Sequence, residues 1–272
     1  MQPVISNGTE YKTGLKPPDK ARMMARPQYV GAYPTIPQSQ WAKSPGLRKL
    51  MPWVEDQNPE GSCGGHGASA SHTAAINEQR VRAGLNALHL SPTYLYGQCN
   101  GGRDNGSAPD DLAQAIEEKG CCLIETVPEH DIYSRRYPPA ADIEAARFKG
   151  DQLLTTNTFE EMATASIRVQ SQFAGIFCGG NFNPNPDGTM PEFDGREVGG
   201  HCIAPIGELE CIDGVWGIWT LNSWGPDWGK NGWCWLPRSY FDAGLPAFHG
   251  IAIISVKPDP LDSGVPPAPI AA

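Results

Sequence analysis

One cysteine in the first quarter of the chain has the surroundings of a nucleophile. Cys63 opens a stretch of mostly small residues, 64–75, which predicts the start of a buried helix. The positive end of a helix dipole favours the thiolate over the thiol. Gln57 lies six residues upstream, and its amide can donate to the oxyanion that forms when a thiolate attacks a carbonyl. The pattern predicts nucleophilic catalysis by Cys63.

Two polar residues far downstream supply the other groups that such chemistry needs. His201 follows Gly199 and Gly200, and Asn222 follows an apolar stretch. An imidazole that takes a thiol proton must be held in one tautomer, and the side-chain oxygen of Asn222 can hold it. Trp224 is two residues further on, and we expect its ring to shield the histidine–asparagine hydrogen bond from water.

These residues resemble those of the papain-like cysteine peptidases, the group that includes papain and the cathepsins. The resemblance covers about residues 36–256, and its most specific part is the run NSWGPDWGKNG from Asn222 to Gly232. It implies an α+β, papain-like two-lobe fold: a helical lobe and a β-barrel-like lobe with the active-site cleft between them. It also implies four roles: Cys63 as nucleophile, His201 as general acid and base, Asn222 as orienter and Gln57 as oxyanion donor. Divergent bacterial and phage-encoded members look similar.

The sequence departs from the family pattern next to the nucleophile. The family has a cysteine three residues before it and an aromatic residue after it, whereas this chain has Glu60 and Gly64. Shifting the alignment by three residues would place His66 at the nucleophile position and predict an inactive protein. The ungapped spacing from Gln57 to Cys63 favours Cys63. His66 would then lie one helical turn from the thiol, where it could tune the site.

A glycine-rich loop and the residues beside His201 are the candidate substrate-binding elements. In the family, a Gly-Gly pair pairs with the peptide backbone as an added strand. Gly101 and Gly102 match those letters, but Gly106 and Ser107 lie closer to the helix predicted at 109–119, so we favour the second pair. We add Gly199, Gly200 and Trp224, which flank the other catalytic groups.

The chain divides by composition into three parts. Residues 1–35 are rich in proline and basic residues and predict an extended N-terminal arm, residues 36–256 the peptidase domain, and residues 257–272 a loosely held Pro-rich tail. The arm is too short for a long helical inhibitory propeptide of the kind that the resemblance implies. It is long enough to lie in the cleft and inhibit the enzyme. Expected elements are helices at 64–88, 91–96 and 109–119 and strands at 173–178, 201–206, 215–221, 233–236 and 251–256.

Composition excludes several classes of function. The 272 residues carry a net charge of −9, which argues against binding a nucleic-acid backbone. We find no secretory signal or membrane span, expect a cytoplasmic protein, and expect its eight cysteines to be reduced. The histidines lack paired ligand spacing, so we expect no metal and no cofactor.

Two alternatives to a peptidase acting on peptides or proteins remain open. The same groups support other acyl transfers on amides, such as amidase, deubiquitinase-like or cross-linking activity. The arm and the tail are also typical of a structural or virion-associated protein that binds assembly partners through its ends while keeping the fold.

Overall fold

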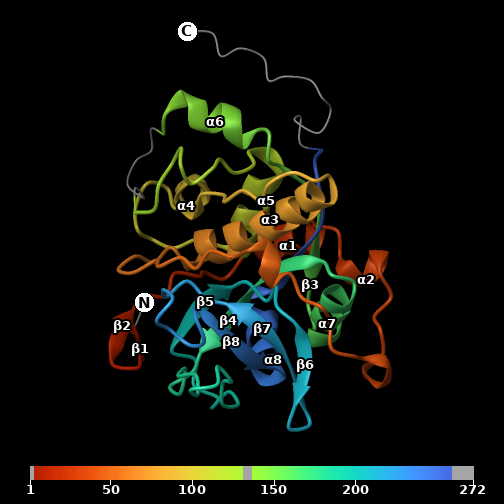
Figure 1. The fold of residues 1–272 in the computed structure, drawn as a ribbon. Helices are drawn as coiled ribbons and strands as arrows, with labels where there is room; N and C mark the ends of the chain where they lie inside the picture. The colour runs from red at the N-terminus through yellow and green to blue at the C-terminus, as the bar shows by residue number, and fades with distance from the viewer. Residues whose placement is uncertain (1–2, 131–136, 259–272) are drawn as a thin grey trace.

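The computed structural model describes residues 3–130 and 137–258, in which a group of helices lies above a group of strands (Figure 1). The upper helices are α3 (Cys63–Arg82), α4 (Pro92–Cys99), α5 (Pro109–Glu118) and α6 (Pro139–Ala145). Two more, α7 (Phe159–Ile167) and α8 (Arg238–Phe248), lie beside the strands. The α+β fold with a helical lobe and a β-rich lobe is therefore confirmed.

The strands form two antiparallel sheets in the lower lobe. The larger sheet has the order β3 (Gly150–Thr156), β9 (Gly250–Val256), β4 (Ser171–Cys178) and β5 (Gly199–Ile203). The smaller has the order β6 (Leu209–Ile212), β7 (Val215–Leu221) and β8 (Trp233–Pro237). Ala204 bridges to Leu221 and joins the two sheets. This junction brings β5, which carries His201, beside the end of β7, which Asn222 directly follows.

Helix α3 is central because its small residues let elements approach from opposite sides. A Cβ on Gly65 would lie 2.6 Å from the carbonyl oxygen of Pro92 in α4, and one on Gly67 would lie 2.9 Å from Cys202 Sγ in β5. Helices and strands pack this closely only where side chains are absent. The helix therefore fixes its first residue, Cys63, against the strand that carries His201.

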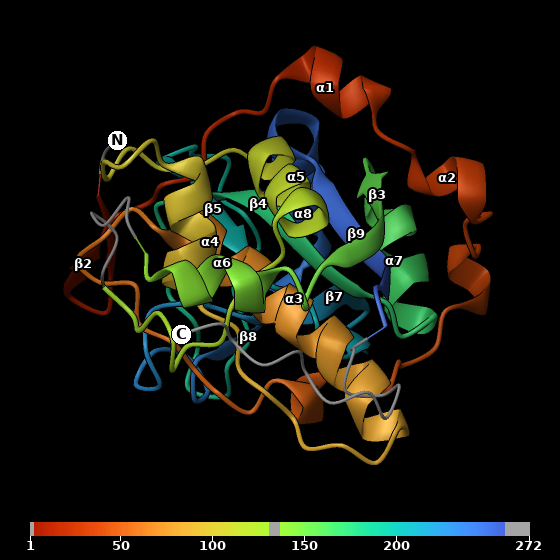
Figure 2. The same ribbon diagram turned by 90° about the horizontal axis from the view of Figure 1, so that it is seen from above.

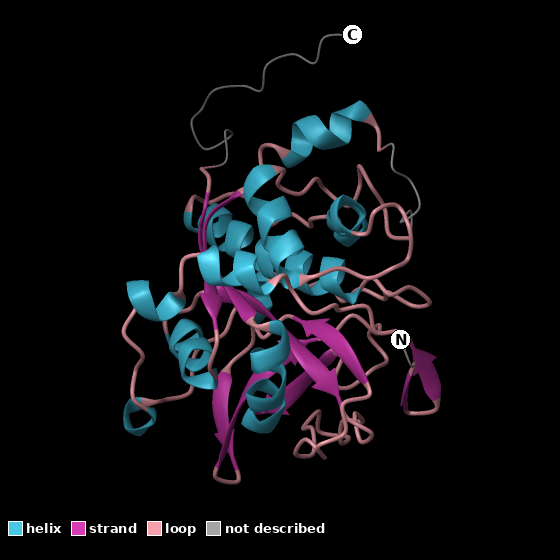
Figure 3. Ribbon diagram, turned by 180° about the vertical axis from the view of Figure 1, so that it is seen from behind, coloured by secondary structure: helices cyan, strands magenta, loops and turns pink. Residues whose placement is uncertain are grey.

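The N-terminal segment is more structured than the expected extended arm. It forms a hairpin of β1 (Val4–Ser6) and β2 (Thr9–Tyr11) and two short helices, α1 (Lys20–Ala25) and α2 (Tyr29–Ala32), joined by extended stretches. The hairpin lies at the edge of the molecule, and α1 and α2 lie on the outside of the molecule as well (Figures 2 and 3). Short turns of 3₁₀ helix follow at Gln38–Gln40 and Arg48–Leu50. The three-part division of the chain stays a prediction, and tail residues 259–272 lie outside the described ranges.

Several elements were not expected from the sequence. Strand β6, and not the strand ending near 206, pairs with β7 around the turn at Asp213 and Gly214. Strand β3 and helices α6, α7 and α8 were also missed. For α7 a signal existed: Thr158 caps the helix by accepting from the Glu161 backbone N–H, and Glu161 accepts in return from the Asn157 N–H. Within the described ranges no helix is long and apolar enough to cross a membrane.

A buried histidine in α3 makes the fold sensitive to acid. His72 is fully buried, neither ring nitrogen has a hydrogen-bond partner among the described residues, and burial lowers its pKa to about 3. An unfolded chain would take up this proton near pH 6.5, so folding stability from this group is present above that pH and is lost as the pH falls.

We expect His72→Leu to remove this share of the acid sensitivity. Between pH 6 and pH 4 the free energy of unfolding should fall less steeply than in the wild type, by about 1.4 kcal/mol per pH unit. Urea denaturation at pH 8, 6 and 4 measures both slopes, and the pH 8 values correct for any change in packing. Parallel curves for the two proteins would show that His72 does not titrate as described.

Candidate active site

Cys63 begins α3 and is completely buried, with Ser62 preceding it as the N-cap residue. Burial raises the pKa of the Cys63 thiol, and hydrogen bonds from the backbone N–H groups of Cys202 and Gly14 are among the contacts that partly oppose this effect. The sulfur is therefore a neutral thiol in this state, placed against the residue that follows His201.

His201 is held by Asn222 in one tautomer. Its Nε2 lies 2.7 Å from Asn222 Oδ1, and the same oxygen accepts from the Ser223 backbone N–H at 2.9 Å, which fixes the orientation of the amide. Because an amide oxygen only accepts, the ring proton is on Nε2 and Nδ1 is free to act as a base. Nδ1 has no hydrogen-bond partner among the described residues, and burial lowers the pKa of His201 to about 4.

Trp224 covers the histidine. Its ring centroid lies 4.9 Å from that of His201, and Tyr11 of β2 stacks on its other face at 4.2 Å, with only 8° between the planes. Trp224 itself is 2 % exposed. The tryptophan therefore packs against the His201 ring and is itself out of contact with water, and its role as a shield of the hydrogen bond stays a prediction.

Gln57 lies in the same site with its amide oriented by a serine. Its Oε1 accepts a hydrogen bond from Ser223 Oγ at 2.7 Å, which directs the amide nitrogen the other way. That nitrogen donates to the carbonyl oxygens of Glu60 at 2.7 Å and Lys12 at 3.1 Å. The donor therefore already binds a carbonyl of the N-terminal segment.

Residues 12–16 occupy the space beside Cys63. The Gly14 N–H donates to Cys63 Sγ at 3.2 Å, and the Gly14 carbonyl accepts from the Ser107 N–H at 2.9 Å. The Lys16 N–H donates to the Ser107 carbonyl at 2.9 Å, and the Leu15 N–H donates to the Gly200 carbonyl at 3.1 Å. The segment is thus hydrogen-bonded to both lobes and lies over the thiol. We call it the cleft segment.

The cleft segment presents a backbone N–H group to the sulfur. Leu15 and Ser107 form a parallel bridge, and it is the backbone N–H of Gly14 that faces the sulfur. A thiolate attacks a carbonyl carbon whose oxygen lies near oxyanion donors. An N–H donor pointing at the sulfur offers no such carbon and stabilises the sulfur in place. At Gly14 the chain therefore covers Cys63 with an N–H group, while the carbonyl that meets the Gln57 amide is that of Lys12, two residues earlier.

Ion pairs hold the helix that follows the cleft segment on the helical lobe. Arg22 of α1 lies 3.0 Å from Asp110 and 2.7 Å from Asp111, and Arg26 lies 2.7 Å from Glu117. Acidic residues on a helix face are usually solvated, but Asp110 is buried here: its side chain is only 2 % exposed. The basic residues of the arm thus have a structural use that their sequence spacing did not reveal.

The fold brings together the residues predicted to bind substrate. Ser107 and Gly200 bond the cleft segment directly, a Cβ on Gly106 would lie 2.0 Å from the Gly14 oxygen, and a Cβ on Gly199 would lie 2.3 Å from Thr13 Oγ1. Gly101, by contrast, has no atom within 4 Å of its Cβ position. The geometry therefore favours the Gly106 pair over the Gly101 pair.

Ser223 and the individual residues of the cleft segment were not predicted as functional from the sequence. Ser223 lies in the run from Asn222 to Gly232 and had been given no role of its own, yet its hydroxyl orients Gln57. In the arm, Gly14 in the stretch from Lys12 to Lys16 was the signal. A glycine permits the chain to pass close to another backbone.

Comparisons with known proteins bear on the fold and on the kind of enzyme. No family model matches the chain. It is 26% identical to a cathepsin B-like protein, CP3, of Giardia intestinalis, over 72% of this chain and 67% of that protein. Among solved structures, procathepsin B S9 of Trypanosoma congolense superposes with a TM-score of 0.66 at 14% identity, covering 91% of this chain and 87% of the other. Xylellain, a cysteine protease of Xylella fastidiosa, gives 0.61 at 17%, covering 90% and 92%.

The structural neighbours share the two lobes described above at low sequence identity, and the curated relative is named for the same kind of enzyme. The chain therefore has the fold of the papain-like cysteine proteases, and this fold and the cathepsin B-like relative together support a cysteine peptidase.

Proposed function

We propose that the protein hydrolyses peptide bonds through a thioester on Cys63, and that its cleft segment keeps it latent. The observation that carries the proposal is the hydrogen bond from His201 Nε2 to Asn222, which leaves Nδ1 free as the base, in a site that also contains Cys63 and Gln57. The Cys63 side chain would be the nucleophile, His201 the general acid and base, Asn222 the orienter and Gln57 the oxyanion donor.

In the proposed reaction, Cys63 Sγ bonds to the carbonyl carbon while its proton passes to His201 Nδ1. The carbonyl oxygen takes up the electron pair and is stabilised by the Gln57 amide and the Cys63 backbone N–H. His201 then gives its proton to the leaving amine as the C–N bond breaks, which leaves a thioester. Water, deprotonated by His201, attacks the thioester and releases the carboxylic acid and the free thiol.

The cleft segment supports a latent form, because substrate and residues 12–16 cannot use the same groups at once. Gln57, Ser107 and Gly200 are all hydrogen-bonded to this segment. Burial also keeps Cys63 and His201 neutral, whereas the nucleophile is the thiolate. The solved neighbour from Trypanosoma congolense is likewise a proenzyme.

Peptide hydrolysis by the full chain and by its Cys63→Ala variant tests this proposal, after the cleft segment has been displaced. Hydrolysis that requires Cys63 supports a peptidase. Hydrolysis of small amides but not of peptides would favour the alternative acyl-transfer enzymes. A folded protein with an open cleft and no activity on either would refute the enzymatic proposal.

Ser223→Ala should lower kcat more than it changes KM. Losing the hydroxyl removes the hydrogen bond that fixes Gln57 Oε1, and one hydrogen bond of about 1 to 1.5 kcal/mol corresponds to a loss of roughly 5- to 12-fold. Steady-state kinetics on a peptide substrate measure this. Ser255→Ala in β9, where the hydroxyl bonds Asp151 at the surface, is the matched control. Equal kcat in both variants would contradict the positioning role of Ser223.

A further inference from the structure

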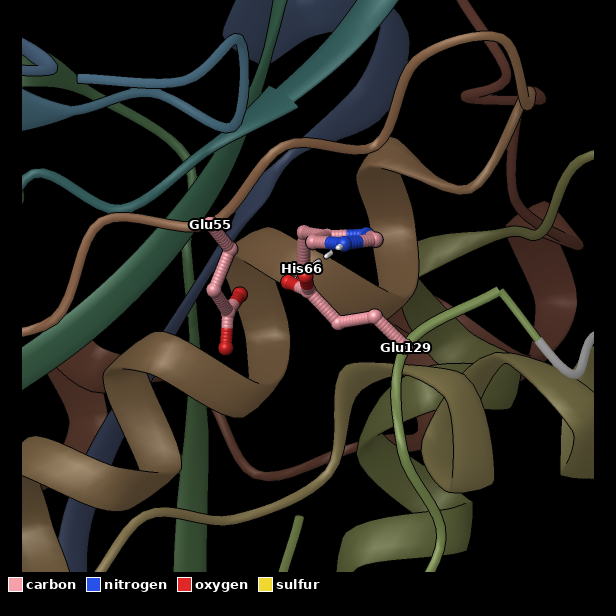
Figure 4. A group of neighbouring side chains, drawn as sticks. All are labelled: Glu55, His66 and Glu129. Carbon is pink, nitrogen blue, oxygen red and sulfur yellow. Dashed lines mark ion pairs between the residues drawn. The ribbon is translucent and has the colours of Figure 1, made fainter.

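Three ionisable side chains meet one helical turn from Cys63, outside the proposed catalytic groups. Glu55 precedes the site in sequence, His66 lies on α3, and Glu129 lies in a loop of the helical lobe (Figure 4). One ligand atom from each lies within 4.8 Å of the other two, and Glu129 Oε1 is 3.8 Å from His66 Nε2. Figure 4 shows the Glu129 carboxylate reaching the imidazole from a separate segment of the chain.

The imidazole of His66 directs Nε2, a nitrogen unpaired among the described residues, at this cluster. His66 Nδ1 lies 3.0 Å from the Ser62 carbonyl oxygen, and because a carbonyl only accepts, Nδ1 carries the proton. In the neutral ring, Nε2 is then the nitrogen with the lone pair. His66 is 2 % exposed, and Nε2 has no hydrogen-bond partner among the described residues. A buried lone pair facing a carboxylate is unfavourable unless a proton or a metal cation lies between them.

The carboxylate of Glu55 and the loop that carries Glu129 are each held by further contacts. Glu55 Oε1 lies 2.7 Å from His89 Nε2, and the His89 ring stacks on Trp53 at 4.6 Å. The loop that carries Glu129 is anchored two residues earlier, where Ser91 Oγ donates to the Val127 carbonyl at 2.6 Å. Glu129 Oε1 has no hydrogen-bond partner among the described residues. Outer contacts of this kind orient ligands in metal sites.

We propose that Glu55, His66 and Glu129 bind a divalent transition-metal ion of the zinc type. One imidazole and two carboxylates suit zinc and its neighbours better than calcium or magnesium, which prefer oxygen ligands alone. In a tetrahedral zinc site, ligand atoms are about 3.4 Å apart, so a small rotation of the partly exposed Glu129 side chain closes the site. The remaining position would take water.

The metal would stabilise the part of the site that carries Gln57. The Glu55 carbonyl accepts from the Gly225 N–H at 3.0 Å, and the Gln57 N–H donates to the Ser223 carbonyl at 2.9 Å. One small cavity is lined by Glu55 and His66 as well as by Asn222 and Ser223. An ion on Glu55 and His66 would therefore tie the Gln57 segment to α3, next to the orienting asparagine.

Zinc binding is best measured in the full chain with Cys63→Ala, because the thiol and His201 could themselves bind zinc. We expect C63A to bind one Zn²⁺ at this site, by equilibrium dialysis with metal analysis. C63A/E129Q should bind this ion at least about tenfold more weakly. The matched control is C63A/E125Q, which removes an exposed acid from the same loop and should bind as C63A does.

Co²⁺ spectra identify the ligands, since cysteine ligands would add a thiolate charge-transfer band that this nitrogen and oxygen site lacks. Circular dichroism checks that C63A/H66Q is folded. This variant should lose the ion that C63A/E129Q also loses. Equal zinc binding by C63A and C63A/E129Q would overturn the proposal and leave His66 and Glu129 as an ion pair without metal. A thiolate band on the ion that E129Q removes would overturn it as well.

Discussion

Replacing Gly14 by valine is expected to speed the reaction of Cys63 with an epoxide inhibitor of cysteine peptidases by roughly 10- to 100-fold. A Cβ at this position would lie 1.7 Å from the Gly61 carbonyl oxygen, and no side-chain rotation relieves a clash with backbone. Overpacking of this kind costs about 1 to 3 kcal/mol. That cost shifts the population toward an open cleft by the stated factor, and water entering the site also favours the thiolate.

The measurement is the rate of labelling by E-64 under reducing conditions, followed by mass spectrometry and mapping of the modified peptide. Gly31→Val is the matched control, because its Cβ in α2 has no atom within 4 Å; it should label at the wild-type rate. Leu15→Glu opens the cleft without touching Gly61, since it places a charge where a buried leucine packs in the core. If both opened variants are folded and label no faster than the wild type, the cleft segment is not the barrier.

Cys63→Ala in the Gly14→Val protein is expected to lower kcat for peptide hydrolysis by four to six orders of magnitude, on the order of what removal of a catalytic nucleophile costs in other hydrolases. The reason is that the proposed thioester forms on the Cys63 sulfur, which alanine lacks. Initial rates on a fluorogenic peptide measure the loss, with thermal unfolding to check the fold.

Cys211→Ala is the control for this prediction. Cys211 is an exposed cysteine, and its removal should leave kcat within about twofold, as for a surface substitution. Residual activity of a few per cent in the Cys63→Ala protein would mean that another group carries the reaction, and would refute the role proposed for Cys63.

Local patterns predicted much of the fold correctly because their causes are local. Ser91 before Pro92 predicted the start of α4, and Ser91 Oγ indeed accepts from the Tyr94 N–H. The apolar stretch Val215–Leu221 matches β7. Where pairing partners decide, prediction was weaker: β6 is short and has no long apolar run, so its pairing with β7 was not predicted.

The candidate site shows the same division. Gln57, Cys63, His201 and Asn222 could be chosen from the sequence because residue type and spacing limit which groups can activate a thiol. Their hydrogen bonds depend on α3, β5 and β7 meeting, and the oriented amide of Gln57 depends on Ser223, 166 residues away. The state of the thiol depends on burial, which no local pattern encodes.

By itself, the sequence determined the chemistry that the chain can perform, since side-chain type sets which groups can attack, transfer protons or donate hydrogen bonds. Only the tertiary structure decided that Lys12–Lys16 covers Cys63, because parallel pairing with Ser107 and the passage of Gly14 over Gly61 arise from packing. It also decided that Glu55, His66 and Glu129 meet. These residues are 11 and 63 positions apart, and a spacing of that kind carries no signal until the chain folds.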